Sequence, residues 1–105
     1  MFIDVLVTCP DEAIAESIGL ACVEDRLAGC ANILGEATSI CRWQGVVERE
    51  REHILLLKTR ASLFEKLAAK VKALHPYETP AIVALNVAAM EKGYAEWLLS
   101  VTEAP

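Results

Sequence analysis

The sequence of 105 residues predicts one α+β domain whose strands and helices follow the order β-α-β-β-α-β, with a further helix at the C-terminus. Two observations predict this class. A long middle segment alternates acidic and basic side chains with the period of two that is typical of a strand. Two segments with apolar residues at helical spacing flank it. A chain of this length has room for one hydrophobic core, so we expect residues 1–105 to form a single domain.

The first strand and the first helix are predicted close to the N-terminus. Residues 2–7 form a short apolar run rich in β-branched side chains, which is typical of a buried strand. The segment from Thr8 to Glu12 then predicts a helix start, because it offers a hydroxyl cap, a proline and acids near the positive end of the helix. Apolar residues follow at helical spacing from Ile14 to Cys22. Arg26 in the last turn and Gly29 just beyond it predict the helix end.

The middle of the chain predicts a long hairpin that turns at Gln44-Gly45, between an extended region from Cys30 to Trp43 and another that starts at Val46. In the second region acids alternate with basic side chains, as Glu48, Arg49, Glu50, Arg51, Glu52 and His53. A strand places the acids on one face and the bases on the other, whereas a helix would mix the signs. Arms of about a dozen residues span roughly 40 Å. We therefore expect the charged part near the turn to project beyond the core.

The second half of the chain predicts a helix, a strand and a terminal helix. Ser62 and Glu65 form a capping box, and the helix that follows ends before His75 because Pro76 disfavours helix in its predecessor. Residues 81–87 predict a fourth strand, and residues 94–101 predict a short third helix.

The complete order is the ferredoxin-like split βαβ pattern, an antiparallel sheet with two helices on one face. The other face is left bare. A bare apolar face and a projecting hairpin predict oligomerisation, with a closed ring as the expected form.

Composition excludes several classes of function. Fifteen acidic and ten basic residues leave a net charge of −5, the opposite of a nucleic-acid-binding surface. The chain has no apolar run of about 18 residues, so we expect no membrane span. The N-terminus has no basic region typical of a signal peptide, so a cytoplasmic location is expected. The cysteines lack the usual zinc spacing, and most are expected to be small buried hydrophobes; they are Cys9, Cys22, Cys30 and Cys41.

Catalytic motifs are not found in the sequence. It contains no G-x-S-x-G, no P-loop and no H-E-x-x-H motif, and no spacing that indicates a Cys–His pair. We therefore expect no enzyme activity and no organic cofactor.

Four segments combine into a more specific pattern. They are Glu24–Asn32, the stretch from Ala37 through Trp43-Gln44-Gly45 to Lys58-Thr59, the motif His75-Pro76-Tyr77-Glu78-Thr79-Pro80, and Tyr94–Leu98. Together they cover nearly the whole chain, and they resemble the CutA divalent-ion-tolerance family. The resemblance implies a homotrimer similar to the PII-type signalling proteins, in which three sheets form a central wall and the hairpins strap neighbours together. It also implies a role in the tolerance of copper and other divalent ions.

The resemblance suggests candidate metal ligands. Some bacterial members bind copper through a cysteine near the end of the first strand and two histidines before Pro-Tyr. The matching positions here are Val7, Leu74 and His75, so only the second histidine is present. Cys9 lies two residues beyond Val7. His75 and Cys9 are therefore the candidate ligands for copper or another divalent cation. Alternatively, His75 is a helix-end histidine that meets the last carbonyls.

The resemblance also suggests a cleft between subunits, lined by Lys58, Tyr77, Glu50 and Trp43. On the predicted strand Glu50, Glu52 and Lys58 share a face. A small anion at Lys58 is one use of the cleft, and a network that only stabilises the trimer is the alternative. The glutamate row either collects divalent cations or pairs with bases across subunits.

Three functions follow from these observations. The first is a binding or signalling module for divalent-cation tolerance, with a metal ion or small anion held between subunits. The second is a trimeric platform that anchors an unidentified partner protein without binding metal itself. The third, a distant alternative because no catalytic motif is present, is an enzyme that uses the same cleft.

Overall fold

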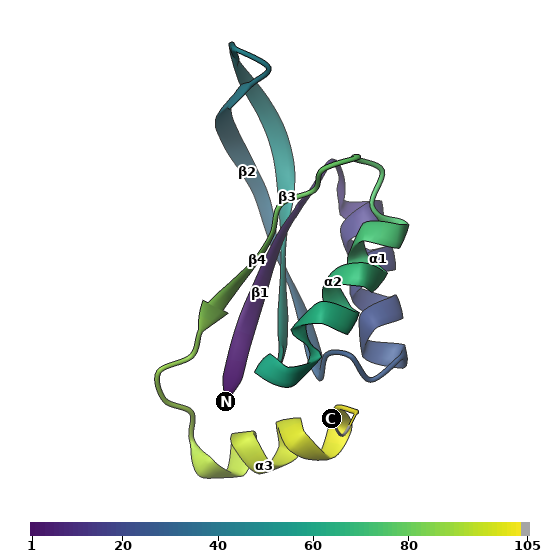
Figure 1. The fold of residues 1–105 in the computed structure, drawn as a ribbon, viewed down its shortest axis with the longest axis vertical. Coiled ribbons are helices and arrows are strands. Elements are labelled where there is room, and N and C mark those ends of the chain that lie inside the picture. Colours follow the sequence, from purple (N-terminus) through teal and green to yellow (C-terminus); the bar gives the residue numbers. More distant parts are fainter. Residues whose placement is uncertain (104–105) are drawn as a thin grey trace.

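The computed structural model describes residues 1–103 (Figure 1). Its elements are β1 (Phe2–Cys9), α1 (Glu12–Glu24), β2 (Cys30–Trp43), β3 (Val46–Arg60), a 3-10 turn (Ala61–Leu63), α2 (Phe64–Leu74), β4 (Ile82–Asn86) and α3 (Lys92–Val101). The strands form one sheet in the order β2-β3-β1-β4, and every pairing is antiparallel. Helices α1 and α2 cover one face of this sheet, which confirms the predicted split βαβ pattern.

The core lies between the sheet and these two helices. Alternate residues of β1 from Ile3 to Cys9 face the helices, together with Leu55 and Leu57 on β3. Ile18 of α1 is likewise fully buried, and so are two apolar side chains of α2. Burying one such aliphatic side chain stabilises the fold by about 1.5–3 kcal/mol.

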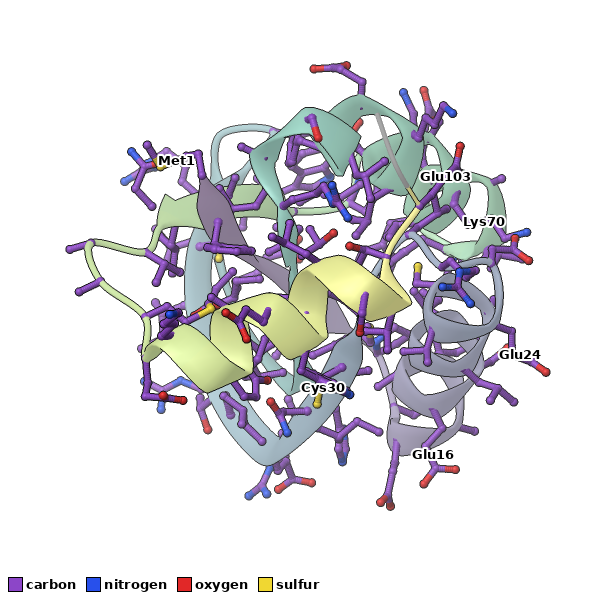
Figure 2. All side chains as sticks on the ribbon, turned by 90° about the horizontal axis from the view of Figure 1, so that it is seen from below. Met1, Glu16, Glu24, Cys30, Lys70 and Glu103 are labelled. Atoms are coloured by element: carbon purple, nitrogen blue, oxygen red, sulfur yellow. The ribbon has the colours of Figure 1, made fainter. Side chains whose placement is uncertain are left out.

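Helix α3 lies across the end of the sheet that is lowest in Figure 1, and it crosses in front of the strands in the view from below (Figure 2). Arg60, the last residue of β3, fastens it there by donating hydrogen bonds to the Leu99 carbonyl at 2.7 Å and to Thr102 Oγ1 at 2.9 Å. Leu98 of α3 is fully buried against the loop that precedes β2.

Strands β2 and β3 form the predicted hairpin. Its outer part, residues 36–53, projects beyond the rest of the sheet, and we call it the arm (Figure 1). Gln44 and Gly45 have φ angles of 50° and 82°, so the two-residue connection has the positive φ values of a type I′ turn. The pairing register places the three glutamates of the arm on one face, and Arg49, Arg51 and His53 on the other. The predicted separation of acids from bases is confirmed.

A β-bulge at Leu34 interrupts the register of β2. Ile33 pairs with Leu55, whereas Gly35 pairs with the next residue, Ile54, so Leu34 is an extra residue. Gly35 has a φ of 97°, which glycine adopts without a Cβ penalty. The bulge therefore reverses which residues of β2 face the helices from this point to the arm tip.

The predicted start and end of the first helix need correction. Thr8 and Cys9 remain in β1 because they pair with β3, and the cap is Asp11, whose carboxylate accepts the Ile14 N–H at 2.8 Å. The helix ends at Glu24, and Arg26 takes the left-handed conformation at φ 60°. Gly29 therefore does not end the helix.

The predicted capping box at Ser62 and Glu65 is wrong. Ser62 lies inside the 3-10 turn that continues from β3, and no side chain caps α2. Leu63, whose side chain is buried in the core, occupies the N-cap position instead. The predicted end of this helix before His75 is confirmed.

The cysteines differ in exposure. Cys9 and Cys22 are buried, as expected of small hydrophobes, whereas Cys30 is half-buried and Cys41 is exposed on the arm. No helix in residues 1–103 is both long enough and apolar enough to cross a bilayer.

Candidate functional site

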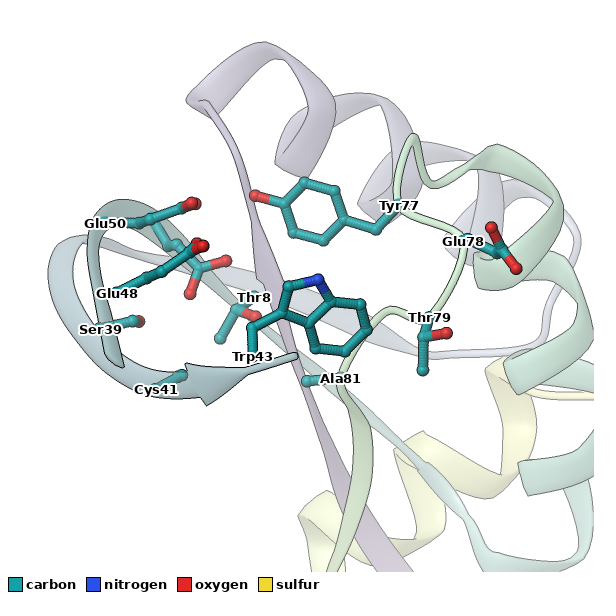
Figure 3. Close-up of a pocket in the computed structure, with 11 residues that line it drawn as sticks. Thr8, Ser39, Cys41, Trp43, Glu48, Glu50, Tyr77, Glu78, Thr79 and Ala81 are labelled. Carbon is teal, nitrogen blue, oxygen red and sulfur yellow. The ribbon is translucent and has the colours of Figure 1, made fainter. Parts of the chain in front are cut away.

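A pocket of about 400 Å³ lies between the arm and the loop that joins α2 to β4; we call it the arm pocket (Figure 3). It is lined by Thr8, Ser39, Cys41, Trp43, Glu48, Glu50, Glu52, Tyr77, Glu78, Thr79 and Ala81. The arm, the end of β1 and the loop all contribute, so the pocket depends on the tertiary structure and not on one segment. Its volume is in the range of small-molecule sites, which is about 300–1,000 Å³.

Strand alternation places the three glutamates of the pocket. Glu48, Glu50 and Glu52 occupy every second position of β3, about 6.6 Å apart along the strand, so their side chains share a face. The β2 residues opposite Glu48 and Glu50 are Cys41 and Ser39, which belong to the same face because of the bulge. One face of the arm thus forms an acidic wall of the pocket.

Tyr77 forms part of the facing wall, and His75 fixes its position. The backbone N–H of Tyr77 donates to His75 Nδ1 at 3.1 Å, so this nitrogen is unprotonated and Nε2 carries the hydrogen. Nε2 then donates to the Thr8 carbonyl at 2.8 Å and ties the loop to β1. The His75 and Tyr77 rings are also in contact, with centroids 4.7 Å apart. In Figure 3 the Tyr77 hydroxyl points toward the side of the pocket where Glu50 lies.

The charged side chains that line the pocket are all acidic. None of the described residues that line it is Lys, Arg or His. Burial raises the pKa of the Tyr77 hydroxyl, and the negative charges of Glu52 and Glu50 raise it further. Glu52 is only 8% exposed and forms no ion pair within the described part of the chain. The site therefore contains a buried carboxylate whose charge is not balanced by a basic side chain.

The structure brings together three of the four residues that the sequence suggested for a cleft. Trp43, Glu50 and Tyr77 all line the arm pocket. Lys58 shares the face of Glu50 and Glu52, but it lies six residues beyond Glu52, about 20 Å along the strand. Its ammonium group is 3.7 Å from an Asp4 carboxylate oxygen. A role for these four residues between subunits stays a prediction.

The candidate metal ligands do not form a metal site in the single chain. Both ring nitrogens of His75 are hydrogen-bonded, so binding a metal would break one of these bonds. Cys9 is fully buried; burial raises the pKa of its thiol to about 11, with smaller contributions from Glu52 and Asp11. Residues 1–103 contain no group of three or more His, Cys, Asp or Glu side chains placed to hold a metal ion. Metal binding by His75 or Cys9 stays a prediction.

The sequence did not identify Thr8, Ser39, Cys41 and Thr79 as pocket residues. Alternation along β3 was sufficient to place Glu48 and Glu52 beside Glu50. It could not place the β2 residues, because the bulge that sets their side of the sheet has no clear signal beyond a glycine within a strand.

The fold and the pocket define a class of protein: a ferredoxin-like α+β domain with a projecting hairpin arm and an acidic pocket at the arm. The family model described as CutA1 divalent ion tolerance protein matches residues 3–101. The chain therefore belongs to the CutA1 divalent ion tolerance family, which confirms the resemblance inferred from its motifs.

Individual relatives support this assignment. The divalent-cation tolerance protein CutA of Thermus thermophilus is 51% identical over 94 residues, which cover 90% of this chain and 91% of that protein. Protein CutA of Mus musculus is 41% identical over 97 residues, which cover 92% of this chain but only 55% of the mouse protein.

The solved structures agree with the sequence relatives. The divalent cation tolerance protein (Cut A1) of Thermus thermophilus superimposes with a TM-score of 0.95 at 48% identity, covering 98% of this chain and all of that one. The CutA structure from Archaeoglobus fulgidus, described as periplasmic, gives a TM-score of 0.95 at 32% identity over 98% of this chain and all of its own.

Proposed function

We propose that the chain is a homotrimeric, PII-like module that acts in the cytoplasm in the tolerance of and response to divalent cations, including copper. Family membership along residues 3–101 is the observation that supports the role in divalent-cation tolerance most directly. A binding or signalling role, without catalysis, agrees with the motifs, which contain no recognised catalytic arrangement.

The uncovered face of the sheet supports a trimer. Val83 and Leu85 of β4 are 50% and 49% exposed on this face, and the arm carries further exposed apolar side chains, Trp43 and Val46 among them. Apolar surface of this kind is usually covered by a partner. In a ring of three copies each arm would lie against a neighbour, and the arm pocket would then face an adjoining subunit.

A directly bound metal would need ligands from more than one subunit. The single chain presents carboxylates in the arm pocket and one histidine whose nitrogens are both occupied, and neither is a closed site. Copper or another divalent cation bound at a subunit interface could combine such groups.

The occupied nitrogens of His75 favour a second candidate function, in which the trimer anchors a partner protein and binds no metal itself. Two measurements separate the candidates. Elemental analysis of the purified protein, with its native mass, and isothermal titration with Cu(II), reduced copper and Zn(II) test direct binding. Stoichiometric binding that His75→Ala abolishes supports the first candidate. The second candidate is supported if the heat of titration equals that of the buffer blank and if both wild type and His75→Ala retain the same partner protein.

The role itself is tested by growth. A bacterial strain that lacks its own CutA protein should tolerate less copper, and expression of this chain should restore its tolerance. The comparison uses copper concentrations that slow the growth of the deletion strain but not of its parent. Equal growth of the deletion strain with and without the chain at all of these concentrations would contradict the proposed role.

The trimer has its own test. Trp43→Ala removes an exposed indole from the arm tip and should raise the protein concentration below which the trimer dissociates. An unchanged light-scattering mass down to nanomolar protein would count against an arm that straps neighbours together.

A further inference from the structure

We propose that the arm pocket binds an organic cation through a protonated amine or guanidinium group. The proposal concerns a ligand class that differs from metal ions, and it does not depend on the role in divalent-cation tolerance. Two features of the pocket lead to it: a largely buried glutamate without a basic partner, and two aromatic rings that line the same pocket.

The buried carboxylate is Glu52. It is more than nine-tenths buried, it lines the pocket, and it forms no ion pair with any described residue. The Tyr77 hydroxyl is a hydrogen-bond partner of Glu52, but a neutral phenol cannot balance a negative charge. The carboxylate faces the pocket from a largely buried residue, and such a partly buried charge attracts a cation more strongly than an exposed one because solvent and salt screen it less. A cationic ligand would supply the missing partner.

The aromatic rings favour an organic cation over a metal ion. Trp43 and Tyr77 both line the pocket, and Figure 3 shows the two rings in the same region with the Glu48 and Glu50 carboxylates to one side. Indole and phenol faces attract ammonium and guanidinium groups within about 6 Å of the ring centroid. A divalent metal needs oxygen ligands at about 2.0–2.6 Å. Glutamates at every second position are about 6.6 Å apart along the strand, which suits two separate ammonium groups better than one small ion.

The same chemistry has two sources. A free amine can enter the pocket from solution, or a second copy of this chain can insert a basic side chain. The opposite face of the arm carries Arg49, which is exposed and forms no ion pair within residues 1–103. Its neighbour Arg51 is already paired with Glu36. Arg49 is therefore an arm side chain that is available to reach a pocket on another copy.

The test uses the full chain treated with a chelator, and the four-carbon diamine putrescine as the probe. Trp97→Phe removes the second of the two tryptophans, so fluorescence reports only Trp43. Putrescine should change the emission saturably, and the four-carbon diol butanediol, which has no charge, should not. Glu52→Gln should weaken binding at least tenfold, and added salt should weaken it further. Glu96→Gln, an exposed acid on α3, is the matched control and should leave binding unchanged.

The outcomes distinguish the two sources. Saturable binding of putrescine to the Trp97→Phe protein, with no further substitution, supports a free amine as the source. Binding that appears only after Arg49→Gln, with a fall in oligomer mass, supports insertion of the arginine from a second copy. The proposal is overturned if neither protein binds putrescine more tightly than butanediol, or if Glu96→Gln weakens binding as much as Glu52→Gln. Because metal is absent throughout, neither result bears on copper tolerance.

Discussion

Replacing His75 with alanine tests whether this residue stabilises the loop of residues 75–81 or serves as a metal ligand. In the structure the imidazole donates one hydrogen bond, accepts another and contacts the Tyr77 ring. A hydrogen bond contributes about 1 kcal/mol net, with a further penalty for a buried group left without a partner. A packed ring pair contributes about 0.5–1.5 kcal/mol. We therefore expect His75→Ala to lower the free energy of unfolding by roughly 2–4 kcal/mol.

The assay is urea unfolding of metal-free protein at a fixed subunit concentration, with hydrogen exchange of the 75–81 loop as a local readout. Leu74→Ala is the matched control, since this neighbouring side chain is 41% exposed and makes no such bonds. His75→Phe keeps a ring beside Tyr77 but leaves the Thr8 carbonyl without its donor, so it should still destabilise. A loss below about 0.5 kcal/mol, the usual size of a neutral surface change, would refute the reasoning. So would a loss that appears only when copper is present.

Three further predictions test the packing around the site. Thr59→Val keeps the shape of a buried side chain but removes the hydroxyl that donates to the Leu27 carbonyl at 2.7 Å, so urea unfolding should show a loss of about 1–3 kcal/mol. Gly29→Ala places a methyl group against the buried Leu98 side chain, and the melting temperature should fall by several degrees, as expected for an overpacking cost of about 1–3 kcal/mol. Burial raises the pKa of the Cys9 thiol from its ordinary value of 9.0 to about 11, so the folded state favours the neutral thiol. Its contribution to stability should be complete below pH 9 and fall as the pH rises toward 11, and Cys9→Ala should show a smaller decline in melting temperature over that interval.

The hairpin shows which parts of the fold a sequence can predict. Alternating charges on β3 and the Gln44-Gly45 pair are local signals, because strand period and turn conformation depend on adjacent residues. They were sufficient to predict the strands, the turn and the face that carries the glutamates. Contacts between distant segments left no such signal. The hydrogen bond from His75 to Thr8 joins residues 67 positions apart, and nothing near either residue indicates it.

The β-bulge explains why the pocket itself could not be predicted. Before Leu34, the odd-numbered residues Ala31 and Ile33 pair with β3 residues that face the helices. After it, the odd-numbered residues of β2 pair with β3 residues of the open face, and these include Cys41 and Trp43. A strand without the extra residue would turn Trp43 away from the glutamates, since a shift of one residue exchanges the two faces. The arm pocket therefore depends on one inserted residue, Leu34, at the base of the arm, where β2 leaves the core and begins to line the pocket.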